Sequence, residues 1–117
     1  MNGHTTLHLT PKEVWERQSG DSEYLPEAYD AGGFIHCTDG DENLLHVANL
    51  FYRLDAREFV VLTIDVDRLT SEVRYEDPDR IYPHIYGALN TNAVVGLRHV
   101  DRSEDGAFIQ FRGDCYS

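Results

Sequence analysis

The chain has 117 residues, of which 41% are apolar, and 21 acidic against 10 basic side chains give it a formal charge of −11. This length and composition suit one globular domain with its own core and exclude a disordered chain, so we expect residues 1–117 to form a single domain. The charge argues against general binding of nucleic acid or of anionic membranes, because both present phosphates.

The two cysteines, Cys37 and Cys115, are too few for a disulfide framework. No apolar signal core opens the chain, and no apolar run approaches the roughly 20 residues of a membrane-spanning helix. We therefore predict a cytoplasmic protein.

The first element is a predicted strand over His4–Leu9. Its alternation puts Leu7 and Leu9 on one buried face and the polar residues, His8 and Thr10 among them, on the other. A helix is then expected to about residue 18, because Thr10 can cap it, Pro11 suits its first turn and residue 13 is a glutamate.

The middle of the chain predicts a strand, a helix and a stronger strand. Tyr24–Asp30 is ambiguous because a proline interrupts it, and two glycines then turn the chain into a short strand, Phe34–Thr38. Helical periodicity follows over Glu42–Tyr52, with apolar positions at Leu44, Leu45, Ala48, Phe51 and Tyr52. Phe59–Val66 is apolar on both faces, which indicates a central strand.

The last third predicts strands only. Glu72–Tyr75 is one, and Ala93–Val100 with Ala107–Phe111 is typical of a hairpin that turns at residues 104–106. Strands outnumber helices without alternating strictly with them. The fold class predicted is therefore α+β, with a mainly antiparallel sheet and two main helices.

His36 is the most informative candidate for a functional residue. It follows a glycine turn at the end of a short strand, where scaffolds often present working side chains, and its neighbours Ile35 and Cys37 point to the other face. A core histidine bonded to the backbone is an equally open interpretation. Cys37 is expected to be a small buried apolar residue.

A second candidate is the segment Tyr82–Gly87, in which Pro83 keeps Tyr82 extended. An extended segment puts His84 and Tyr86 on one face, either as the wall of a pocket or as a packed edge. Glu76 closes the preceding strand just before the loop that leads to His84. We keep it as the one acidic candidate.

A metal site of three imidazoles is the alternative to these interpretations. His8, His36 and His84 are far apart in the sequence, and no two have the close spacing of a helical ligand pair, so we predict no metal. The other histidines are expected to be structural or solvated: His4, His46 and His99.

Three stretches together resemble a known family. They are Leu7–Thr10, Gly33–Thr38 and Tyr82–Gly87, with Trp15 after the first and Ala93–Val95 after the last. Their order and spacing are similar to the small bacterial and plant proteins grouped as domain of unknown function 952, over about residues 7–100. That family implies no settled activity.

More distantly, these stretches resemble the ADP-ribosyltransferase superfamily, in which a split α+β sheet grips NAD. The resemblance implies that His8 meets the nicotinamide-side ribose, that His36 takes the second role, and that Glu76 or His84 takes the third. Transferases of that superfamily usually place a glutamate third, whereas His84 and Tyr86 are the clearer candidates here. Its RNA 2′-phosphotransferases need basic residues, which this acidic chain does not favour.

Two functions are carried forward on that resemblance. The first is ADP-ribosyl transfer from NAD or a related nucleotide, with NAD as substrate, with catalytic residues His36, His84 and Glu76, and with ligand contacts from His8, Thr10, Thr38 and Tyr86. The second is a non-catalytic module that binds a nucleotide or another metabolite in the same cleft. The acceptor and the oligomeric state stay open.

Overall fold

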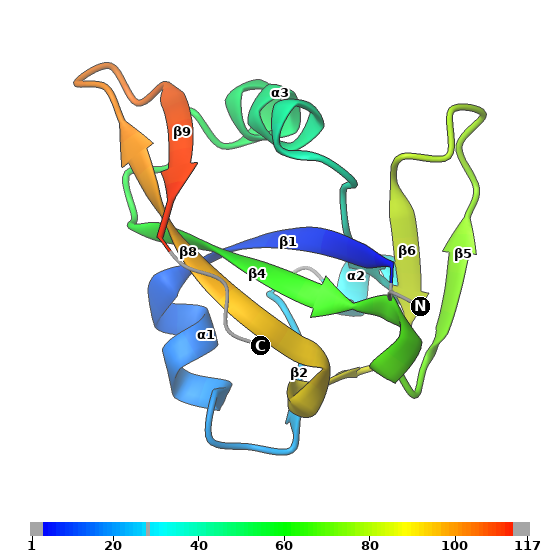
Figure 1. Cartoon of the computed structure of the whole chain (residues 1–117). Coiled ribbons are helices and arrows are strands. Elements are labelled where there is room, and N and C mark those ends of the chain that lie inside the picture. Colours follow the sequence, from blue (N-terminus) through cyan, green and yellow to red (C-terminus); the bar gives the residue numbers. More distant parts are fainter. Residues whose placement is uncertain (1–3, 28, 114–117) are drawn as a thin grey trace.

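The largest element of the fold is a four-stranded antiparallel sheet. A computed structural model describes residues 4–27 and 29–113. The strand order is β1-β4-β8-β9, where the strands span Thr5–Pro11, Phe59–Asp65, Val94–Arg102 and Phe108–Arg112. Figure 1 shows this sheet crossing the molecule, with helix α3 (Asp41–Phe51) above it and helix α1 (Lys12–Gln18) below it.

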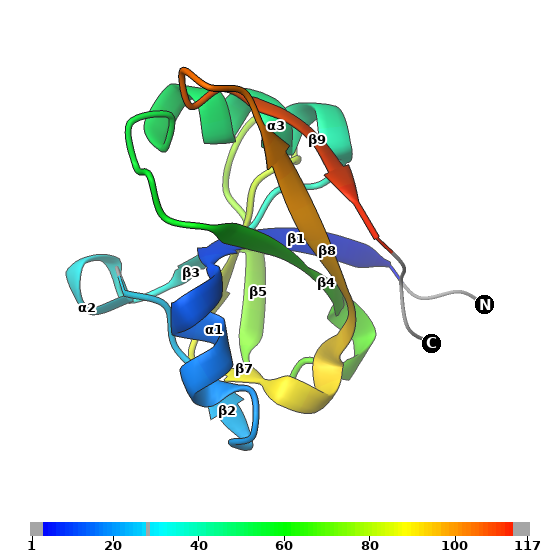
Figure 2. The same ribbon diagram turned by 90° about the vertical axis from the view of Figure 1, so that its left-hand side faces the viewer.

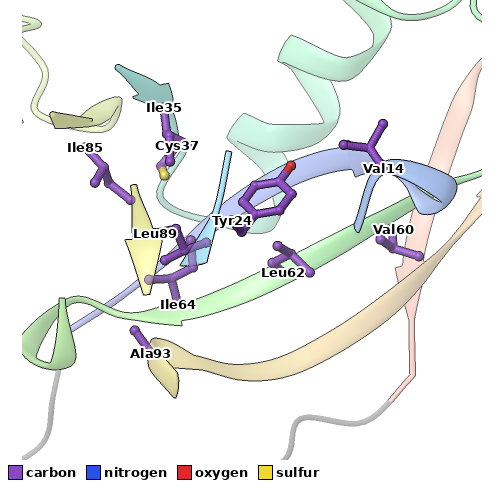
Figure 3. Close-up of a cluster of buried hydrophobic side chains, with 10 residues drawn as sticks. All are labelled: Val14, Tyr24, Ile35, Cys37, Val60, Leu62, Ile64, Ile85, Leu89 and Ala93. Atoms are coloured by element: carbon purple, nitrogen blue, oxygen red, sulfur yellow. The ribbon is translucent and has the colours of Figure 1, made fainter. Parts of the chain in front are cut away.

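Strand β4 is central, as its apolar sequence predicted. It pairs with β1 on one side and β8 on the other, and Phe59 to Ile64 are all buried. One face of β4 packs with Val14 of α1 in the larger core cluster, which Figure 3 shows, and the other packs with Leu44 and Ala48 of α3. The sheet therefore separates two cores, each closed by one helix.

A smaller antiparallel sheet lies beside the first. Its order is β3-β6-β5, formed by Ile35–His36, Pro83–Tyr86 and Glu72–Tyr75. The two sheets meet at a single bridge between Leu7 and Thr38. Figure 1 shows β5 and β6 side by side at one end of β1 and β4, and Figure 2 shows the large sheet between α3 at the top and α1 below. The predicted α+β class, with antiparallel strands and two main helices, is confirmed.

Short elements occupy the segments that the sequence left ambiguous. A two-stranded sheet joins β2 (Glu23–Tyr24) to β7 (Leu89–Asn90), and a one-turn helix, α2 (Tyr29–Gly32), precedes β3. Turns of 3-10 helix, Val66–Arg68 and Thr91–Ala93, follow β4 and precede β8. No helix in the described part of the chain is long and apolar enough to cross a membrane.

Two predictions for β1 and α1 were wrong. Both faces of β1 are buried from Thr6 onward, because the face predicted to be polar packs on the core that contains Tyr24. Thr10 does not cap α1, since Pro11 holds the N-cap position and no side chain bonds there. The Thr10 hydroxyl lies 2.8 Å from the Tyr24 hydroxyl, and that buried contact replaces the expected cap.

The apolar stripe of α3 is covered only in part. Leu44 and Ala48 are buried as expected, but Phe51 is 70% exposed. Phe51 lies on the same apolar stripe as Leu44, but it is the last residue of α3 and therefore extends past the part of the helix that packs on the core. The apolar periodicity of the sequence therefore extends one turn past the buried part of α3.

The predicted hairpin between β8 and β9 is present, and its turn contains Gly106 at φ +92°. A side chain there would collide with the backbone oxygen of Arg53, so the position requires glycine on two counts. This turn lies against the end of α3 and fixes β9 beside the helix.

Candidate functional site

A cleft of about 150 Å³ lies along β1. We call it the β1 cleft. Its inner wall is β1 from Leu7 to Pro11, and its other walls come from the segment after β2, from the chain around β3, and from α3 and the residues that follow it. The remaining lining residues are Pro26, Glu27, Phe34, His36, Thr38, Leu44, Val47, Tyr52, Arg57 and Phe59.

The backbone of β1 presents a free edge to this cleft. Leu7 donates its N–H to the Thr38 carbonyl at 3.0 Å and accepts from the Thr38 N–H at 2.8 Å, so its polar backbone atoms point away from β4. Antiparallel pairing repeats every second residue, so the N–H and C=O of Leu9 point the same way. Among the described residues no partner meets them, and Leu9 lines the cleft. A donor and an acceptor therefore face the ligand space.

His8 lies at the floor of the cleft, within a linear series of hydrogen bonds that runs from the His36 carbonyl through His8 and Tyr24 to Thr10. It is 6% exposed, its Nδ1 lies 2.8 Å from the His36 carbonyl, and its Nε2 lies 3.0 Å from the Tyr24 hydroxyl. Burial lowers the pKa of His8 to about 4, so the ring is neutral near pH 7. A carbonyl can only accept, so Nδ1 carries the proton and Nε2 accepts from Tyr24.

The same chain of bonds includes Thr10. Because the Tyr24 proton is directed at His8, the Thr10 hydroxyl donates to the Tyr24 oxygen, 2.8 Å away. Both nitrogens of His8 are thus occupied, and its bond to the His36 carbonyl fixes β3 against β1. The roles of His8 and Thr10 as ligand contacts stay predictions, and the structure gives both residues a positioning role.

The outer face of the small sheet carries the histidines. His36, His84 and Arg74 are direct partners across β3, β6 and β5 and form one rung. Their strand neighbours Ile35 and Ile85 are fully buried on the inner face. The predicted alternation is confirmed, and the His36 and His84 rings lie with their centroids 5.0 Å apart. We call this face, with Tyr86 and Glu76, the histidine surface.

Phe34 joins the cleft to the histidine surface. Its ring stacks on His84 with a centroid distance of 4.2 Å and meets the edge of His36 at 4.6 Å. Phe34 and His36 both line the cleft, whereas His84, Tyr86 and Glu76 do not. The structure therefore brings His36 and His84 together, but only His36 lines the cleft, and the Phe34 ring covers His84.

Glu76 is held as a carboxylate on the histidine surface. Its Oε1 accepts a short hydrogen bond from the Tyr86 hydroxyl and lies 3.2 Å from Nδ1 of His84. The bond from Tyr86, and then the bond from His84, lower the pKa of Glu76. The bond to Glu76 in turn raises the pKa of Tyr86. Partial burial, and then the neighbouring imidazole of His84, lower the pKa of His36. At pH 7 the surface thus combines a neutral imidazole with a carboxylate.

The cations near the site are already paired. Arg57, at the mouth of the cleft, lies 2.8 Å from an oxygen of Asp55 and 3.0 Å from one of Glu27. Arg74 lies 3.0 Å from Glu72 and also covers the Tyr86 ring, 4.6 Å from its centroid. Both guanidinium groups are therefore already neutralised by neighbouring carboxylates.

Sequence reasoning missed several parts of the site. Thr38 lines the cleft and stays a predicted ligand contact, whereas Phe34, Tyr24 and the backbone of Leu9 were not among the predicted site residues. A signal for Phe34 existed, because strand alternation puts it on the face of His36. Tyr24 gave no such signal, since its partners are distant in the sequence.

A further polar cluster was also missed. The Tyr75 hydroxyl donates to Asp39 at 2.7 Å, and His4 lies 3.2 Å from the same carboxylate oxygen. Tyr75 alternates with Arg74 on β5, so this cluster lies on the face opposite the histidine surface. His4 therefore has a structural partner. Across the residues described, no group of three or more His, Cys, Asp or Glu is arranged to hold a metal.

Comparison with known protein families identifies the chain. The model of the family described as "Protein of unknown function (DUF952)" matches residues 9–97. The chain belongs to the DUF952 family. The matched residues include most of the β1 cleft and all of the histidine surface, so both are features of this DUF952 domain. No curated protein matches the chain significantly.

The fold of this DUF952 protein is also that of a solved structure. The X-ray structure of protein CC0527 from Caulobacter crescentus matches with a TM-score of 0.77 at 21% identity, over 91% of this chain and 94% of that one. The solution NMR structure of CC0527 gives a TM-score of 0.69 at 21% identity, over 87% and 89% of the two chains. At this identity the likeness concerns the fold, and neither description names an activity.

Proposed function

We propose that this DUF952 domain binds a small nucleotide-like metabolite, with one ring of the ligand in the β1 cleft. The observation that carries the proposal is the free backbone pair of Leu9 inside a largely apolar cleft. Ligand sites commonly combine apolar walls with a few fixed polar groups that set orientation.

The size of the cleft supports a single ring. Its volume of about 150 Å³ is below the roughly 300–1,000 Å³ of sites for drug-sized ligands, but a cavity of about 150 Å³ holds a benzene ring. The Leu9 N–H and C=O lie side by side and complement a group that carries an acceptor next to a donor. A ring carboxamide and the edge of a nucleobase both present that pattern.

The charges support the nucleoside end of such a ligand more than its phosphates. The net charge of −11 repels anions at long range. The guanidinium groups of Arg57 and Arg74 are already paired with carboxylates. A neutral ring with a sugar attached meets neither obstacle, and the exposed imidazole of His36 at the rim can bond to its hydroxyls.

A thermal-shift panel tests this proposal. It contains nicotinamide, nicotinamide mononucleotide, NAD, ADP-ribose, other nucleosides and nucleotides, and zinc. A ligand at 100 times its dissociation constant stabilises the fold by about 2.7 kcal/mol, which a melt resolves. We expect a ring-containing compound to stabilise the wild type and to lose that effect in His36→Ala. A panel without any stabilising compound would count against the proposal.

Transfer of an ADP-ribosyl group is the second candidate, and the observation that favours it is the Glu76 carboxylate fixed beside His84 and Tyr86. In such a transfer the bond from the anomeric carbon to the nicotinamide nitrogen breaks, and nicotinamide leaves with the electron pair. The acceptor bonds to that carbon and passes its proton to a base. A carboxylate near the carbon stabilises the developing positive charge.

Release of free nicotinamide from NAD separates the two candidates. Binding of a panel compound without any release favours the module, whereas release that disappears in Glu76→Gln favours the transferase. Glu72→Gln is the matched control, because Glu72 begins the strand that Glu76 follows, and among the described residues its side chain bonds only to Arg74.

A further inference from the structure

The β1 cleft and the carboxylate of Glu76 lie on two sides of one aromatic ring. Phe34 lines the cleft, while its ring is stacked on His84 at 4.2 Å and lies 5.3 Å from Tyr86. Among the described residues, the Glu76 carboxylate bonds to His84 and Tyr86. A ligand in the cleft therefore meets Phe34 before it can meet the carboxylate.

The backbone gives Phe34 little support. Strand β3 begins only at Ile35, so Phe34 lies outside the strand ladder. Two glycines precede it, and Gly33 has a φ of +76° with nothing within 4 Å of a built Cβ. The ring is thus held by its contacts with the rings of His36, His84 and Tyr86, and it lies close to Gly32 in the turn itself. Stacked pairs of this kind contribute only about 0.5–1.5 kcal/mol each.

We infer that the Phe34 ring is a movable gate that sets the size of ligand the site accepts. With the ring on His84, the cleft holds a single ring of a ligand. With the ring turned away, the cleft joins the histidine surface, and His84, Tyr86 and Glu76 become available to the next part of a longer ligand. The inference rests on the proposed function, because it concerns the same cleft.

Two probes of different length test the gate: nicotinamide, which is a single ring, and nicotinamide mononucleotide, which adds a sugar phosphate. Phe34→Ala opens the gate permanently, so we expect the ratio of the two dissociation constants to shift at least tenfold in favour of the mononucleotide. Phe111→Ala is the control, since it removes the same ring from β9, which does not line the cleft. Equal loss of affinity for both probes in Phe34→Ala would overturn the gate and leave the cleft proposal standing.

A measurement without ligand keeps the inference testable if neither probe binds or the variant does not fold. Relaxation dispersion on the aromatic carbons of the wild-type protein reports exchange between ring positions on the microsecond to millisecond scale. A gate predicts a common exchange rate for Phe34 and His84, because one ring leaves the other. A static Phe34 ring in that experiment would overturn the inference, whatever the fate of the proposed function.

Discussion

The floor of the β1 cleft and its rim use histidine in opposite ways. At the floor, His8 is buried with both nitrogens bonded, and Tyr24 and Thr10 complete the chain of bonds. At the rim, His36 is exposed, its ring lies against the rings of Phe34 and His84, and neither of its ring nitrogens has a hydrogen bond among the described residues. An imidazole with no free nitrogen can only hold the shape of the cleft, whereas one with free nitrogens can meet a ligand.

This contrast predicts the largest effect on stability at the floor. Replacing His8 with alanine leaves a cavity and deprives the Tyr24 hydroxyl and the His36 carbonyl of their partner. We expect a loss of about 3 kcal/mol of unfolding free energy. Denaturant melts measure it, and a loss below about 1 kcal/mol would show that His8 is not the structural centre of the floor.

The next effect is a dependence on pH. Burial lowers the pKa of His8 to about 4 in the folded state, from 6.5. Between these values the unfolded chain binds a proton that the folded chain does not, so stability is full above about pH 6.5 and falls toward pH 4. At about 1.4 kcal/mol per pH unit, the wild type should lose about 2 kcal/mol between pH 7.5 and 5 through this group.

The matched variant for that experiment is His8→Gln, which does not titrate. Carboxylates contribute to acid destabilisation in both proteins, so the difference between their urea melts isolates His8. Identical pH dependence in the two proteins would contradict the assignment of a neutral, buried imidazole.

Removing the Tyr24 hydroxyl should lower the unfolding free energy by a smaller amount. Tyr24→Phe keeps the ring in the core but leaves His8 Nε2 and the Thr10 hydroxyl unpaired, which should cost about 1 kcal/mol. Thr10→Val removes the hydroxyl at the end of the same series of hydrogen bonds. Because the two residues share a network, the double variant should lose less than the sum of the single variants. Strict additivity would show that Thr10 and Tyr24 act independently.

The smallest effect on stability is predicted at the rim. His36→Ala removes an exposed ring, its contacts with the rings of Phe34 and His84, and little core packing, so the unfolding free energy should fall by less than about 1 kcal/mol. Binding of whichever compound stabilises the wild type should be lost. A variant that melts far more easily, yet binds normally while folded, would end the functional case for His36.

The sequence predicted the strands well because alternation is a local property. The opposite faces of Ile35 and His36, and the pairing of His84 with Tyr86, follow from it directly. Alternation does not say which face meets a core, and β1 was misjudged because the small sheet and Tyr24 cover its polar side. The β1 cleft depends on that distant packing, so only some of its residues could be named in advance.

The most direct test of the central claim is the backbone amide of Leu9. Leu7 and Leu9 point to the same side of β1, but only the Leu7 amide is bonded, at 3.0 Å to the Thr38 carbonyl. In a titration of ¹⁵N-labelled protein with nicotinamide, we expect the Leu9 amide to shift strongly, with the amides of Phe34, His36 and Thr38 shifting less and Leu7 least. Shifts that gather elsewhere on the molecule, or a Leu9 amide that stays still while the protein binds the compound, would contradict the account.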